Sequence, residues 1–171
     1  HTAKVRARPP LQSFFLHATV HKPVIGRQMH ITCPSPRERC ITDTLKLAEG
    51  EDDAVWAHMQ DAPQRLQNLP WLRPHGVRRT SDGDVVVEAE LVASHAFDVH
   101  FDATLTFSWT EGIGETHGRV LRLAVQCLDT EVYRGTFTLR DGTVLHAAQV
   151  HLPFFRLAAP VMDAKLKHAL T

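Results

Sequence analysis

The strongest constraint on the fold of this chain is the pair Asp141-Gly142, which separates two segments of alternating apolar and polar residues. Asp-Gly is typical of the two-residue turn of a β-hairpin, because both turn positions adopt positive φ. Such a turn fixes the strand register, so that Phe137 faces His146. In this register the apolar residues of both strands share one face, as a sheet with one buried face requires. The sequence therefore predicts an antiparallel hairpin over 132–152.

The same alternation predicts strands upstream of the hairpin. Apolar residues recur at every second position, with polar residues on the opposite face. Ser81-Asp82-Gly83 is a loop between two of these strands, with glycine at its end. The predicted strands cover 41–48, 77–80, 84–92, 97–109 and 119–128.

Two short helices are predicted between the first two of these strands. The first runs through Met59, and Asp52 or Asp53 is expected to cap its N-terminus. Pro63 cannot continue this helix but suits the first turn of another. The second helix is expected over 64–69.

A longer helix is expected at the end of the chain, within 154–170. Its regular part is expected to begin near Pro160, and it carries a broad apolar face. A helix with such a face must cover another element, and the apolar face of the sheet is the available partner.

Composition limits the classes of function. The chain has 171 residues, of which 43% are hydrophobic, enough to bury a core in one domain. Lys plus Arg and Asp plus Glu are 19 each, and this balance argues against a nucleic-acid partner. No apolar run reaches the length of a membrane-spanning helix. Five of the ten prolines fall in residues 1–40, so we expect an N-terminal arm packed on a domain over 41–171. Within this arm, short extended pieces are expected at 11–20 and 26–32, packed on a sheet edge.

Two local strings and the order of the predicted elements resemble the START/Bet v 1-like superfamily, which includes polyketide cyclase/dehydrase and lipid-transfer proteins. The segment 53–56, Asp-Ala-Val-Trp, followed by Pro-Trp-Leu at 70–72, is similar to the first helix pair of that family. The segments 133–139 and 142–145 are similar to its last hairpin. The resemblance implies an α+β helix-grip fold: a curved antiparallel sheet of six to seven strands, two short helices and a long C-terminal helix. It also implies an apolar cavity between the sheet and that helix.

These observations lead to a first hypothesis, the binding of a lipid-, polyketide- or quinone-like hydrophobic small molecule. Such pockets are mostly apolar, with a few polar groups that orient the ligand. Tyr133 and His146 are the polar residues on the inward phase of the final hairpin and are therefore the candidate anchors. The other predicted ligand-binding residues are apolar: Phe101, Leu105, Phe137, Val150 and Met162.

Two alternatives use the same residues. A cyclase or dehydrase could use His146 as a general acid or base and Tyr133 to polarise a carbonyl. No catalytic triad, phosphate-binding loop or dinucleotide-binding turn occurs, so we assign no catalytic residue and expect no cofactor. The third reading is a domain with a solid core that acts through protein interactions. Gly135 is expected to make room for a ligand or a helix, or to bend its strand.

The remaining polar residues have ordinary explanations. Cys33 and Cys40 could form a disulfide if the protein is exported, but free thiols are the simpler reading. His100 and Asp102, with His95 nearby, suggest a surface metal site, but a solvated polar pair is more common, so we assign no metal ligands. No signal peptide is visible, and a cytoplasmic location is slightly favoured over export.

Overall fold

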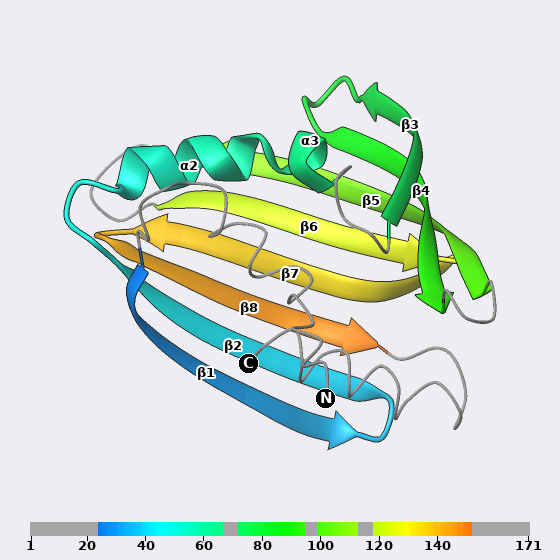
Figure 1. Ribbon diagram of the computed structural model, residues 1–171, viewed down its shortest axis with the longest axis horizontal. Helices are drawn as coiled ribbons and strands as arrows, with labels where there is room; N and C mark the ends of the chain where they lie inside the picture. Colours follow the sequence, from blue (N-terminus) through cyan, green and yellow to red (C-terminus); the bar gives the residue numbers. More distant parts are fainter. Residues whose placement is uncertain (1–23, 67–71, 95–98, 113–117, 152–171) are drawn as a thin grey trace, which may run out of the picture.

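The structure is a computed structural model, which describes residues 24–66, 72–94, 99–112 and 118–151 (Figure 1). These residues form one eight-stranded antiparallel sheet in the order β1-β2-β8-β7-β6-β5-β4-β3, with two helices between β2 and β3. The elements are β1 (Val24–Ser35), β2 (Glu38–Leu47), α2 (Asp52–Gln60), α3 (Ala62–Leu66), β3 (Leu72–Arg79), β4 (Val85–Ser94), β5 (Val99–Glu111), β6 (Arg119–Cys127), β7 (Thr130–Arg140) and β8 (Thr143–His151).

The expected fold class, an α+β helix-grip fold with six to seven strands and a long C-terminal helix, is wrong. The described chain is mainly an eight-stranded antiparallel sheet, and its two described helices have only nine and five residues. The segment 154–170, in which a third helix was expected, lies outside the described residues.

The additional strand is β1, which comes from the proline-rich segment predicted to be an arm. It pairs with β2 at one edge of the sheet, where Met29 is opposite Asp43 and Ile31 is opposite Ile41. The stretch between Pro23 and Pro34 contains no proline, so its backbone N–H groups are available for pairing. Residues 1–23 of the predicted arm lie outside the described residues.

The predicted register of the final hairpin is confirmed. Asp141 and Gly142 have φ values of 48° and 68°, the left-handed conformation that a two-residue hairpin turn requires. Phe137 is opposite His146, as the turn chemistry predicted. The same register places Val150 opposite Tyr133.

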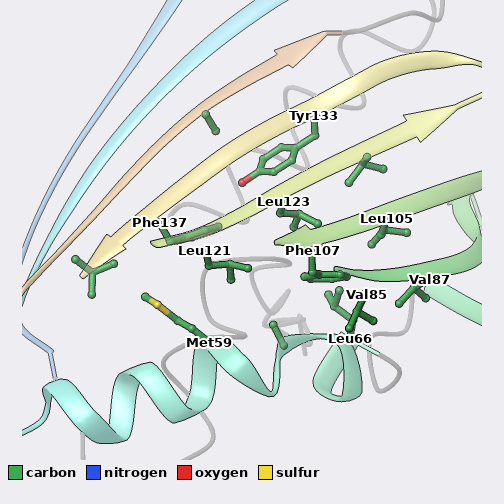
Figure 2. Packing of buried hydrophobic residues seen from close by; sticks show 14 of the residues in the cluster. Met59, Leu66, Val85, Val87, Leu105, Phe107, Leu121, Leu123, Tyr133 and Phe137 are labelled. Carbon is green, nitrogen blue, oxygen red and sulfur yellow. The ribbon is translucent and has the colours of Figure 1, made fainter. Parts of the chain in front are cut away.

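The inner face of the sheet is the face toward α2 and α3, and its buried residues on the central strands form the core. Figure 2 shows Leu105, Phe107 and Leu121 pointing from β5 and β6 toward Met59 of α2 and Leu66 of α3. The alternation in 97–109 and 119–128 predicted these inward positions correctly. Burial of large side chains at every second position is the main driving force for this packing.

The two aspartates at the start of α2 do not cap the helix, contrary to expectation. Glu51 occupies the N-cap position and makes no side-chain capping hydrogen bond. Asp52 instead accepts a hydrogen bond from the Gly142 N–H at 3.1 Å, and Asp53 forms an ion pair with Arg119 at 2.6 Å. Both carboxylates therefore bind partners that are distant in sequence instead of the N–H groups at the helix end. These two contacts join α2 to the β7–β8 turn and to β6.

The contact between Asp52 and the turn gives a test of this packing. We expect Asp52→Ala to lower the free energy of unfolding by about 1 kcal/mol, because the Gly142 N–H loses its acceptor. Urea denaturation measures this change. Asp53→Ala is the matched control, because it removes a neighbouring carboxylate from an exposed ion pair and is expected to cost less. Equal losses from the two variants would contradict a specific role for the Asp52–Gly142 contact.

Candidate functional site

Tyr133 and His146 form a buried polar pair on the inner face. The Tyr133 hydroxyl lies 2.8 Å from Nε2 of His146, and the two residues are 8% and 3% exposed. Tyr133 comes from β7 and His146 from β8, and the Asp-Gly turn sets the register that brings them together. The structure therefore joins the two polar anchors that the sequence predicted.

Gly135 explains how the tyrosine reaches the histidine. A Cβ atom at this position would lie 2.8 Å from Cε1 of Tyr133, and closer still to its Cζ and hydroxyl oxygen. Real Cβ atoms do not approach other heavy atoms so closely, so the ring occupies the space that a side chain at residue 135 would fill. Gly135 was expected to make room for a ligand or a helix, or to bend its strand. The structure shows instead that the ring of the chain's own Tyr133 fills the space.

Phe137 fixes the orientation of the imidazole. Its ring is stacked on that of His146, with centroids 4.1 Å apart and planes 1° from parallel. Burial, with a smaller contribution from the charge of Arg27, lowers the pKa of His146 from 6.5 to about 4. Burial likewise raises the pKa of Tyr133 above its ordinary value. At neutral pH both members of the pair are uncharged, because burial disfavours the charged forms.

An ion pair between a buried aspartate and a partly exposed arginine continues the line of polar residues toward the sheet edge. Asp43 of β2 is 0% exposed and lies opposite His146 in the strand register. Arg27 of β1 donates to both of its carboxylate oxygens, with a shortest distance of 3.0 Å. The polar line therefore crosses four neighbouring strands: β1, β2, β8 and β7.

Sequence reasoning missed Arg27 and Asp43. The alternation of β2 gave Ile41, Leu45 and Leu47 as inward residues, and Asp43 occupies the inward position between them. An acidic residue on an otherwise apolar phase is the signal that would have found it, since buried charges are normally paired. Its partner could not be found in the same way, because the sequence predicted only a short extended piece over 26–32 at a sheet edge and not the strand with which it pairs.

One nitrogen of the histidine has no partner among the described residues. Nδ1 of His146 is buried, and no described group lies within hydrogen-bonding distance in a suitable geometry. If the tyrosine O–H donates to Nε2, the neutral imidazole carries its proton on Nδ1 and leaves one unmet donor. If Nε2–H donates instead, both Nδ1 and the tyrosine proton lack partners. The first arrangement leaves fewer groups unsatisfied and is favoured on that ground.

The other predicted ligand-binding residues divide into two groups. Phe137 and Val150 lie beside the polar pair, and both are buried. Leu105 and the half-buried Phe101 lie on β5, which is three strands away from β8. Strands are spaced by about 4.8 Å, so β5 is roughly 14 Å from the histidine strand. Met162 lies outside the described residues.

Two cavities among the described residues lie elsewhere. One has a volume of about 550 Å³ and lies beside the start of α2, the end of β2 and the β7–β8 turn. The other has a volume of about 400 Å³ and lies between the end of α2 and the β3–β4 loop. Neither is lined by any of the predicted ligand-binding residues.

The structure also places the cysteines and the candidate metal ligands. Cys33, Cys40 and Cys127 are free thiols, and burial raises the pKa of Cys127. Within the described ranges no three His, Cys, Asp or Glu side chains come together as a metal site. His95, which was considered with His100, lies outside those ranges.

No helix in the described part of the chain is both long and apolar enough to cross a lipid bilayer.

Comparisons with known proteins add no identification at this point. Neither the models of known protein families nor the curated proteins contain a match to this chain.

The Tyr133–His146 hydrogen bond can be tested with a double-mutant cycle. We expect Tyr133→Phe to lower the free energy of unfolding by about 1–3 kcal/mol, because Nε2 of His146 becomes a buried group without a partner. The double variant Tyr133→Phe/His146→Phe removes both polar groups and is expected to cost less than the sum of the single variants. Urea denaturation of all four proteins gives the coupling energy. Strictly additive losses would show that the hydrogen bond contributes nothing to stability.

The lowered pKa of His146 predicts a pH dependence of stability. Between pH 6.5 and 4 the unfolded chain binds a proton at this residue while the folded protein does not, so stability falls as the pH falls. The loss attributable to His146 is at most about 3 kcal/mol. It is measured as the difference in unfolding free energy between the wild type and the double variant at pH 7 and pH 4.5. His58, whose pKa burial also lowers, is present in both proteins and cancels. A difference that is independent of pH would contradict the assignment.

Proposed function

We propose that the inner face binds an apolar small molecule and that the Tyr133–His146 pair orients it. The observation that carries the proposal is the unpartnered Nδ1 of His146, a buried hydrogen-bonding group on an apolar face. Burying such a group without a partner costs free energy, and a ligand that supplies one recovers that cost. Phe137 and Val150 beside the pair supply apolar contact surface, as ligand pockets normally do.

The family resemblance enters this proposal only as support. From β2 onward the described elements follow the order strand, two short helices and antiparallel strands, which agrees with the START/Bet v 1-like order stated above. We propose a relationship to that superfamily on this ground, separately from the helix-grip class, which is not retained. A cyclase or dehydrase activity of the same residues stays a prediction.

A packed core without a ligand is the second candidate, and the burial of the polar pair favours it. The side chains of Tyr133 and His146 are deeply buried, and the two cavities named above lie away from them. In this reading the inner face is filled by side chains, and the protein acts through its outer surface.

Native mass spectrometry of the full chain after gentle purification distinguishes the two candidates. Ligand binding predicts that the native protein has an additional mass, which is lost on denaturation. The released compound is expected to be rich in carbon and soluble in organic solvent. The double variant Tyr133→Phe/His146→Phe is expected to retain less of that material than the wild type. His30→Phe, a change at an exposed histidine on β1, is the matched control and is expected to retain it fully.

A second measurement covers a ligand that is lost during purification. A naphthalene-based fluorescent probe is expected to bind the wild type in a saturable manner. No copurified compound together with no saturable probe binding would reject the binding proposal in favour of the packed core.

A further inference from the structure

We propose that the molecule accepted at this site is a neutral apolar compound that offers a carbonyl oxygen to Nδ1 of His146, rather than an anion such as a fatty acid. This inference rests on the proposed function and specifies its class of ligand. It follows from the hydrogen-bonding state of the histidine and from the charges around it.

The first step is to decide whether Nδ1 of His146 is a hydrogen-bond donor or an acceptor. The hydroxyl of Tyr133 lies at hydrogen-bonding distance from Nε2, and the favoured arrangement has this hydroxyl as the donor. Nδ1 then carries the proton and is itself a donor. A ligand atom that satisfies Nδ1 must therefore be an acceptor, and a ketone, quinone or ester oxygen meets this requirement.

The second step is the balance of charge around the histidine. The titratable or charged groups that face it from the neighbouring strands are Tyr133 on β7, Asp43 on β2 and Arg27 on β1. Arg27 is engaged by Asp43 through both carboxylate oxygens, so this ion pair is already neutral overall. The tyrosine and the histidine are also uncharged at neutral pH. Within the part of the chain that the structure describes, the site therefore holds no excess positive charge for an anion.

The third step compares the two kinds of acceptor. A carboxylate at Nδ1 would be a second buried negative charge beside Asp43, which is 0% exposed and occupies the neighbouring strand at the same register position. Burying an uncompensated charge is far more costly than burying a neutral polar group. A carbonyl oxygen satisfies the same N–H without that cost, which is why the neutral acceptor is preferred.

Three probes of nearly equal size separate the alternatives: 2-acetylnaphthalene, 2-ethylnaphthalene and 2-naphthoate. We expect the ketone to bind the wild-type chain at pH 7 about tenfold more tightly than the ethyl compound, because it gains one hydrogen bond in a buried site. We expect the carboxylate to bind at least about tenfold more weakly than the ketone. Fluorescence titration measures all three dissociation constants.

The variants locate the donor. In Tyr133→Phe/His146→Phe the affinity for the ketone is expected to fall to that for the ethyl compound, whose own affinity stays unchanged. His30→Phe is the matched control and is expected to leave all three affinities as in the wild type. A ketone preference that persists in the double variant would show that His146 is not the donor.

The outcomes separate this inference from the function on which it rests. Binding of 2-naphthoate as tight as that of the ketone overturns the preference for neutral ligands and leaves the binding function in place. Failure of all three probes to bind overturns both. The comparison among probes uses the wild-type protein alone, so it decides the question even if the double variant does not fold.

Discussion

The Asp141-Gly142 turn sets the geometry on which the rest of the inner face depends. Both residues adopt positive φ, and this closes a two-residue loop that allows only one strand register. A shift of a single position would turn every inward side chain of β8 to the opposite face. Tyr133, Phe137 and His146 would then no longer meet. The turn also binds Asp52 through the Gly142 N–H, so the same two residues place α2 against the sheet.

The sequence was most informative where local chemistry determines structure. The turn residues and the apolar alternation predicted the β7–β8 register and placed Tyr133 and His146 together. It was least informative where pairing depends on distant segments. The sequence indicated an extended piece over 26–32, but nothing local in Val24–Ser35 shows that it pairs with β2. Asp52 and Asp53 matched the local sequence rule for helix caps. In the structure their carboxylates instead bind groups from distant parts of the chain.

The candidate site shows the same division. Polar residues on an apolar phase were sufficient to identify His146 and Tyr133. Asp43 satisfied the same criterion and was passed over, because the strand was judged by its apolar members alone. The role of Arg27 depends on the position of the edge strand and could not be read from its surroundings in the sequence. The burial of charge beside a neutral histidine, on which the proposed class of ligand rests, therefore became visible only in three dimensions.

The space above Gly135 links two positions that are not neighbours in the chain. Because the ring of Tyr133 fills that space, a larger residue at position 135 requires that Tyr133 is replaced as well. Together with the turn and the histidine they define a compact signature, Tyr-x-Gly-x-Phe-x3-Asp-Gly-x3-His, over residues 133–146. Distant relatives that share this arrangement should be recognisable by that spacing even where the remainder of the chain has diverged.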